Sequence, residues 1–129
     1  MSFRIVDFSS IRYPDGMPAV RQGKFLHLSE GEEKQLLVLS PYELSMFHAQ
    51  ILERYCSLNR LEGRFIRNPE FYKVAGTVIE VIGGGHWRLD ETEFRLFGKS
   101  TIYGKFEVEG LRGKVQALPE YGKYKIVIE

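Results

Sequence analysis

The sequence has little of what commits a chain to disulfides, membranes or strongly charged partners. It contains one cysteine, Cys56, in 129 residues, which excludes an internal disulfide and is typical of a reducing compartment. No apolar run approaches the roughly 20 residues of a membrane span, and the first ten residues lack the pattern of a signal peptide. We therefore expect a cytoplasmic protein that does not bind membranes.

Charge of either sign is not in excess. Eighteen Lys and Arg face seventeen Asp and Glu, which leaves a formal net charge of +1. No global field of this chain attracts nucleic acid or an anionic membrane, so we expect no nucleic-acid partner. Any anion-binding site must be built locally.

Several catalytic motifs are also absent. Six residues after Cys56 the chain has Glu62, where a Cys-x5-Arg phosphatase needs arginine. The GKS segment at 98–100 resembles the end of a Walker A loop, but Glu93 stands where its first glycine belongs. The three histidines are far apart, and the three aspartates form no Asp-x-Asp pair. We therefore expect neither a metal site nor a cofactor.

Length and patterning predict a single α+β domain spanning residues 1–129. Apolar segments bounded by turn residues predict about six strands, near residues 3–8, 23–30, 34–40, 71–85, 86–100 and 123–129. The third is almost wholly apolar, so we expect it to be central and covered on both faces. Gly76 is a predicted bulge, DETE at 90–93 is a predicted turn or kink, and 62–70 is a predicted polar linker. A short helix is expected at about 109–118.

The clearest helix signal lies in SPYELSMFHAQILERYCSL. Ser40 and Glu43 form a capping box and Pro41 suits the first helical position, which predicts a helix over 41–58. One face of this helix carries Leu44, His48, Ile51, Tyr55 and Leu58. His48 is thus expected in or beside the buried stripe, where a histidine is most often a satisfied core residue. The two helices should flank a mixed sheet.

Two short segments can let another group come close to the backbone. The run Gly83–Gly85 marks a β-bulge or a place where another segment approaches the backbone, and we expect it to let the helix bring His48 close. KSTIYG at 99–104 is by default a connecting loop, but its consecutive N–H groups beside Lys99 can also form an anion nest.

Three of these segments together resemble a known family. FHAQI (47–51), VIGGGH (81–86) and KSTIYG (99–104) resemble, in order and approximate spacing, motifs of the Janus/Ocnus family of small metal-independent protein histidine phosphatases. The likeness extends to GKFLHL upstream and ALPEYGKYKIVI downstream, and so covers most of the chain from Lys24 onward. It implies a mixed sheet flanked by two helices, which the apolar pattern predicts independently.

The resemblance also implies a role for each matched residue. The family's catalytic histidine falls on His48, and its phosphate-facing lysine falls on Lys24. Its Ser-x-x-Tyr-Gly loop, which offers backbone N–H groups and a hydroxyl to phosphoryl oxygens, falls on residues 100–104. The substrate-binding residues in that loop would be Ser100, Thr101 and Ile102.

One position departs from the family pattern. In the animal members arginine follows the glycine triplet directly, whereas here His86 takes that place and Arg88 comes two residues later. We include Arg88 among the candidate substrate-binding residues. Whether Arg88 or His86 replaces the family's cation stays open.

The resemblance implies hydrolysis of a phosphoramidate, with His48 activating a water without metal. The expected partners are a phosphorylated protein or a small phosphoramidate, with inorganic phosphate or sulfate able to occupy the same site. Phosphohistidine is the favoured substrate, and phospholysine is not excluded. Two other classes stay open: a phosphate or phosphopeptide-binding module without turnover, and a structural protein that shares the fold. Phosphate release separates the first from both others.

Overall fold

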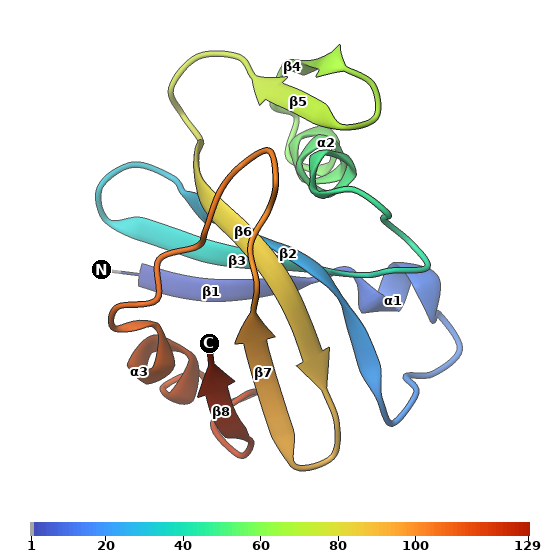
Figure 1. Ribbon diagram of the computed structural model, residues 1–129, viewed down its shortest axis with the longest axis vertical. Coiled ribbons are helices and arrows are strands. Elements are labelled where there is room, and N and C mark those ends of the chain that lie inside the picture. The colour runs from blue at the N-terminus through green and yellow to red at the C-terminus, as the bar shows by residue number, and fades with distance from the viewer. Residues whose placement is uncertain (1) are drawn as a thin grey trace.

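The computed structural model describes residues 2–129, which form a curled six-stranded mixed sheet, a two-stranded sheet and three short helices (Figure 1). The strands are β1 (Ser2–Asp7), β2 (Arg21–Ser29), β3 (Lys34–Pro41), β4 (Gly63–Arg67), β5 (Phe71–Val74), β6 (Glu80–Leu89), β7 (Glu93–Phe97) and β8 (Lys125–Ile128). The helices are α1 (Ser9–Arg12), α2 (His48–Leu58) and α3 (Leu111–Gln116). The predicted α+β class and six-stranded mixed sheet are confirmed.

The chain between the last two strands crosses over the middle of the main sheet. The order is β1-β3-β2-β6-β7-β8, with parallel pairs at both edges and antiparallel pairs between them. Because β7 and β8 are parallel, the chain between them must cross over the sheet. This crossover runs through the loop at 98–110 and α3, and it pairs Lys105 with Gly84 in the middle of β6.

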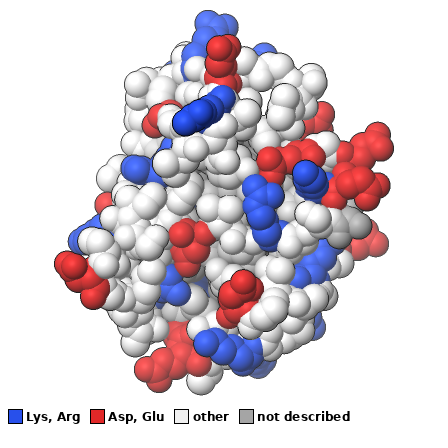
Figure 2. All heavy atoms as spheres, turned by 180° about the vertical axis from the view of Figure 1, so that it is seen from behind, with Lys and Arg blue, Asp and Glu red and all other residues white. Residues whose placement is uncertain are grey.

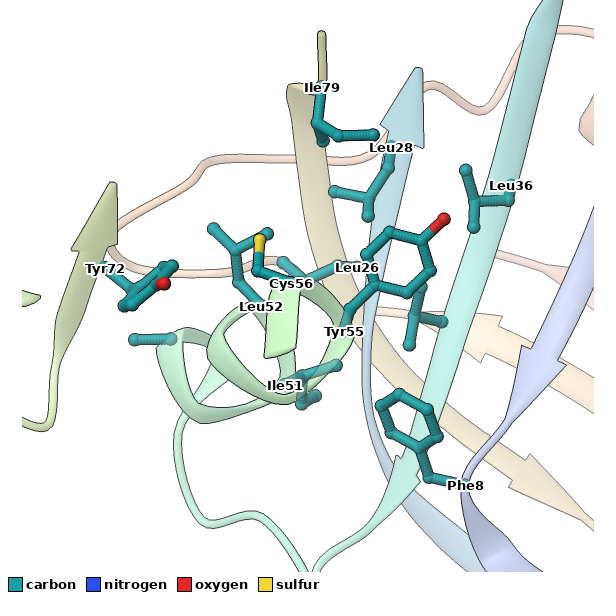
Figure 3. Close-up of a cluster of buried hydrophobic side chains, with 12 residues drawn as sticks. Phe8, Leu26, Leu28, Leu36, Ile51, Leu52, Tyr55, Cys56, Tyr72 and Ile79 are labelled. Carbon is teal, nitrogen blue, oxygen red and sulfur yellow. The ribbon is translucent and has the colours of Figure 1, made fainter. Parts of the chain in front are cut away.

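Buried side chains pack on both faces of the main sheet. Phe25 and Leu26, neighbours in β2, belong to opposite clusters because successive side chains of a strand alternate. The cluster under α2 includes Leu26, Leu28, Leu36, Ile51, Leu52, Tyr55 and Cys56 (Figure 3). The cluster under α3 includes Phe25, Trp87, Phe94, Phe106 and Leu111. All of residues 36–41 in β3 are buried, as predicted for a central strand.

The main helix begins later than predicted. We expected a helix from Pro41, but β3 extends to Pro41 and α2 begins at His48. The Ser40 hydroxyl donates to Ser45 Oγ at 2.8 Å and caps no helix. Instead the side-chain oxygen of Gln50 accepts hydrogen bonds from the two backbone N–H groups just before α2. Pairing of Ser40 and Pro41 with β2 thus overrides the local helix signal, and His48 lies in the first turn of α2.

The segment predicted as a polar linker is half of a hairpin. Residues 63–67 form β4, which pairs with β5 in the separate sheet beside α2 (Figure 1). The long strand predicted over 71–85 is therefore wrong, because β5 ends at Val74 and β6 begins at Glu80. Gly76 has a φ of 72° in the intervening turn and forms no bulge. Phe65 and Tyr72 of this hairpin pack on the cluster under α2.

Other boundaries differ less. Residues 86–89, predicted to begin the returning strand, still belong to β6, and the chain reverses at 90–92 as expected. Gly110, with a φ of 75°, delays α3, which is shorter at both ends than the predicted 109–118. The one-turn helix α1 was not predicted. The final strand, β8, is confirmed.

The surface carries charges of both signs in mixture. Figure 2 shows acidic and basic side chains intermingled over one face, as the net charge of +1 leads us to expect. Within residues 2–129 none of the helices is both long and apolar enough to cross a membrane.

Candidate functional site

A cavity of about 350 Å³ opens where β2, β6 and the start of α2 meet two loops. Its lining residues are Lys24, Phe47, His48, Arg67, Glu70, His86, Lys99, Ser100, Thr101 and Ile102. The lining carries three positive side chains and one negative one, so the cavity is cationic in a chain that is almost neutral overall. This cavity is therefore the candidate for a locally built anion site.

The buried imidazole of His48 is the central group of this cavity. Its side chain is almost inaccessible, with 7% of the residue exposed. Nε2 lies 2.9 Å from the carbonyl oxygen of Gly85. Because a carbonyl only accepts, Nε2 carries the hydrogen and Nδ1 keeps its lone pair. Within residues 2–129 Nδ1 has no hydrogen-bond partner, and the residue lines the cavity.

The surroundings keep His48 neutral. Burial lowers the pKa of His48 to about 4; the hydrogen bond to Gly85 opposes this shift, and the charges of Lys24 and His86 add to it. Near pH 7 the imidazole of the free protein is therefore a neutral proton acceptor. An anion bound beside Nδ1 would raise this pKa again, because a negative charge favours the imidazolium form.

This pKa predicts how stability changes with pH. The pKa of histidine is about 6.5 in an unfolded chain, so the unfolded state takes up the proton first as the pH falls. The contribution of the neutral His48 to stability is complete above the pKa of the unfolded chain, about 6.5, and is lost as the pH falls to about 4. Protonation of His48 in the unfolded state should therefore lower the free energy of unfolding by roughly 2 kcal/mol between pH 7 and pH 5. Urea denaturation at both pH values should show a smaller loss for His48→Gln, and equal losses would contradict the pKa shift.

The three glycines of β6 admit the groups that surround them. A Cβ on Gly84 would lie 2.9 Å from His48 Cδ2 and 2.8 Å from the Phe25 oxygen, and a Cβ on Gly83 would overlap the Lys105 carbonyl. The pairing of β6 with β2 also shifts register beside this run. Both structural predictions, a bulge and a close approach of His48, are thus confirmed.

Lys24 and His86 stand side by side on β2 and β6. They are paired residues in the register of these strands. Lys24 Nζ donates to the Met46 carbonyl at 2.7 Å, and burial lowers the pKa of Lys24. The His86 ring lies edge-on to His48, with centroids 6.0 Å apart, and its Nδ1 is 2.8 Å from Tyr42 Oη. Burial and then the charge of Lys24 lower the pKa of His86.

The loop at 98–104 is closed by its own hydrogen bonds. Ser100 and Gly104 exchange backbone hydrogen bonds of 3.1 and 2.8 Å, and Ser100 Oγ accepts from the N–H of Tyr103 at 3.1 Å. The N–H of Ser100 is thus already used, which corrects the predicted nest. Within residues 2–129 the N–H groups of Thr101 and Ile102 have no protein acceptor. They are the backbone donors that remain for an anion.

Tyr103 ties this loop to the β4–β5 hairpin. Its hydroxyl accepts from the N–H of Tyr72 at 2.9 Å and donates to the carbonyl of the same residue at 2.6 Å. Two reciprocal bonds to one backbone unit fix the loop against β5. The loop at 98–104 and the hairpin, whose strand β4 ends at Arg67, are thereby held together.

Arg88 is not brought to the cavity. Its Nη1 lies 2.7 Å from Asp90 Oδ2, and it lines a different hollow with Ala19 and Val20. His86 lines the cavity instead. Because it lies two residues before Arg88 on β6, the two side chains point to the same face of the sheet but are about 7 Å apart. The structure therefore does not bring Arg88 together with the other predicted site residues.

Arg67 is the cation that sequence reasoning missed. It ends β4 and lines the cavity, with its Nε 2.8 Å from Glu70 Oε2. It was overlooked because 62–70 was interpreted as a linker. The Asn-Pro dipeptide that follows it is a turn signal, and apolar residues on both sides of that turn indicate a hairpin.

The different positions of the two arginines predict different effects on anion binding. Arg67→Ala should weaken phosphate binding about threefold, because an exposed cation within reach of an anion contributes modestly. Arg88→Ala should leave it unchanged. Calorimetric titration of both variants with phosphate checks this, and a larger loss for Arg88→Ala would contradict the geometry.

A bound metal is not needed to explain the cavity. Within residues 2–129 no group of three or more His, Cys, Asp or Glu side chains is arranged to hold a metal ion. Lysine and arginine side chains and backbone N–H groups are donors, which suit an oxyanion rather than a cation. A neutral imidazole beside such donors can take a proton from a water that attacks the bound anion.

No protein family model matches the sequence, and no curated protein matches it significantly. What the cavity can do therefore follows from its own residues. It combines a locally cationic lining and two free backbone donors, which suit an oxyanion, with a buried neutral histidine that can accept a proton.

Proposed function

We propose that this protein is a metal-independent phosphoramidate phosphatase that acts on phosphohistidine. The observation that carries the proposal is the state of His48: neutral, fixed through Nε2 to Gly85, and with Nδ1 unpartnered in a cationic cavity. The resemblance of the surrounding motifs to the Janus/Ocnus protein histidine phosphatases supports the same conclusion. A reducing, cytoplasmic setting is proposed with it, as the single cysteine leads us to expect.

In the proposed reaction the phosphoryl group sits between the cations and the loop. Lys24, Lys99 and the free N–H groups of Thr101 and Ile102 neutralise its oxygens, and the Ser100 hydroxyl can donate to one of them. These donors are in place before the reaction, so they favour the charge distribution of the transition state without reorganisation. The substrate is thereby held for attack by water.

His48 then acts as the general base. A water oxygen forms a bond to phosphorus while Nδ1 of His48 takes the water proton. The P–N bond breaks, and its electron pair goes to the nitrogen of the leaving imidazole. If the other nitrogen of that imidazole already carries a proton, the leaving group departs as neutral imidazole. General base catalysis of this kind typically contributes about 10² to 10⁴ in rate.

A cysteine nucleophile is not a competing mechanism. Cys56 is fully buried in the cluster under α2, away from the cavity lining. Burial, with the nearby charge of Glu53, raises the pKa of Cys56 to about 11, so the thiol is protonated at neutral pH. A protonated thiol is a poor nucleophile.

The proposal is tested by release of inorganic phosphate from a phosphohistidine peptide at neutral pH. A phosphoserine peptide of the same sequence is the control, because its leaving alkoxide needs a proton that no residue of this site is proposed to supply. We expect release from the first peptide and little from the second. Absence of release from both would leave only the binding roles.

A binding module without turnover is the second candidate, because Arg88 lines a different hollow beside Asp90 and Arg67 is paired with Glu70. Both candidates require that phosphate binds. Phosphate at millimolar concentration should raise the melting temperature by mass action. Lys24→Ala should reduce this shift, because it removes a partly buried cation from the lining.

The matched control for that measurement is Lys123→Ala. Lys123 lies just before β8, contacts the ring of Tyr124, and is not part of the cavity lining. Its replacement should leave the phosphate-induced shift intact. If both variants behave alike, or phosphate does not move the wild-type melting curve, neither phosphate-binding role stands.

A further inference from the structure

An exposed lysine joins the two ends of the loop at 98–104. Lys105 directly follows this loop and is not among the residues that line the cavity. Its Nζ donates to the carbonyl oxygen of Gly98, the first residue of the loop, at 2.7 Å. It also donates to the backbone oxygen of Glu129, the residue after β8, at 2.7 Å. One side chain thus connects both ends of the loop with the end of the last strand.

The end of β8 is a fixed point for this lysine. β8 pairs with β7 in parallel, so the two strands end side by side (Figure 1). The N–H of Glu129 donates to the carbonyl of Leu96 at 2.9 Å, which continues the pairing as far as the residue that Lys105 contacts. The side chain of Glu129 also forms an ion pair with Arg95. The backbone oxygen that accepts from Lys105 therefore belongs to the main sheet.

The loop is anchored at three places, and Lys105 provides the anchor at its start. The end of the loop is held by the sheet, because the N–H of Gly84 donates to the carbonyl of Gly104 at 3.0 Å. Its middle is held through the hydroxyl of Tyr103. At its start β7 has already ended, and Gly98 turns the chain with a φ of 73°. The bond from Lys105 therefore fixes the end that strand pairing does not.

The orientation of the Gly98 carbonyl matters for the anion site. A peptide unit is planar, so this carbonyl and the N–H of Lys99 turn together. The direction in which Lys99 leaves the sheet follows from that orientation. So does the start of the segment that carries the free N–H groups of Thr101 and Ile102, which line the cavity with Lys99. A loop whose start could turn would present these donors in several orientations.

We infer that Lys105 is a positioning residue for the anion site: it holds the start of the loop so that Lys99 and the loop N–H groups converge on one bound anion. Lys105 does not touch the anion in this arrangement and acts through its two hydrogen bonds. The inference rests on the anion site of the proposed function and does not depend on turnover. It extends the site to the end of β8, a strand none of whose residues lines the cavity.

The experiment compares two lysine variants in calorimetric titrations of the folded protein with phosphate. Lys105→Met removes both hydrogen bonds and should weaken phosphate binding about fivefold, because part of the binding free energy must then order the loop. Lys125→Met is the matched control, since it removes an exposed lysine from the start of β8. It should change the affinity by less than about twofold, because an isolated surface charge contributes little. Unchanged affinity in Lys105→Met, or an equal loss in Lys125→Met, would overturn the inference.

Salt separates positioning from simple attraction by the charge of Lys105. The titrations of wild-type protein and Lys105→Met are therefore repeated at about 0.5 M sodium chloride, which screens exposed charges beyond a few ångströms. The ratio of the two affinities should persist there, because the orientation of the loop does not depend on long-range attraction. A ratio that falls to one would show that only the charge of Lys105 acts, and would overturn the inference.

Backbone amide NMR tests the positioning without a ligand. In the free protein the N–H resonances of residues 99–102 should move in Lys105→Met and stay in place in Lys125→Met. If wild-type protein binds no phosphate, the proposed function fails, and these resonances still decide on the loop: moved signals support Lys105 as its anchor, and unmoved signals overturn it. If phosphate binds but is not released from a phosphohistidine peptide, the affinities still test the inference.

Discussion

Replacing His48 with alanine should lower kcat/KM for a phosphohistidine peptide by at least about 10²-fold, because the group that accepts the water proton is lost. The cations and loop donors stay in place, so phosphate should still raise the melting temperature of the variant. Loss of turnover with retained binding is the signature of a missing base. Phosphate release followed at several peptide concentrations, together with melting curves, checks both parts.

His27 provides the control. It is also buried, with 1% of its surface exposed, and its Nε2 lies 3.1 Å from Gln35 Oε1 on the other face of the sheet from His48. His27→Ala should lower stability, because it breaks a buried polar contact, yet the folded fraction should turn over normally. If His48→Ala retains full activity, or His27→Ala loses as much per folded molecule, another residue is the base.

Gly84→Ala should disturb the site without removing any charged or titratable group. The added Cβ would lie 2.9 Å from the His48 ring and 2.8 Å from the Phe25 carbonyl, and the backbone carbonyl cannot move aside easily. Overpacking of this kind costs about 1–3 kcal/mol of stability. A displacement of the imidazole by even about 1 Å should reduce kcat by tenfold or more. Denaturant unfolding and steady-state kinetics measure the two effects.

Gly113→Ala is the matched substitution. A Cβ there would meet no atom within 4 Å, and the residue lies within α3. Alanine in a helix is favoured over glycine by about 0.5–1 kcal/mol, so this variant should be slightly more stable and equally active. If Gly84→Ala is as active as Gly113→Ala, then His48 does not depend on the glycine run.

The parts of the fold that sequence predicted well are those with strong apolar patterns. The buried strand β3 and the alternating β8 were recognisable because nothing local competes with their pattern. The start of α2 was not, because Ser40 and Pro41 carry a helix-start signal while strand pairing holds them in β3. A single sequence does not show which of two local preferences the neighbouring strands will favour.

The candidate site was predictable to the extent that it follows short motifs. Lys24, His48 and residues 100–102 line one cavity, although the Ser100 N–H is used within the loop. Arg88 was misplaced because two residues along a strand move a side chain about 7 Å. Arg67 was missed because it reaches the cavity from a hairpin that pairs outside the main sheet. Such residues are identified by topology rather than by local sequence.

The most direct measurement for the central claim is nitrogen NMR of the His48 imidazole in wild-type protein, assigned by comparison with His48→Gln. At pH 7 we expect a neutral ring with hydrogen on Nε2 and a lone pair on Nδ1, and we expect phosphate to shift the Nδ1 resonance and raise the pKa of His48. A ring protonated on Nδ1, or phosphate that perturbs other histidines and leaves His48 unchanged, would contradict the account.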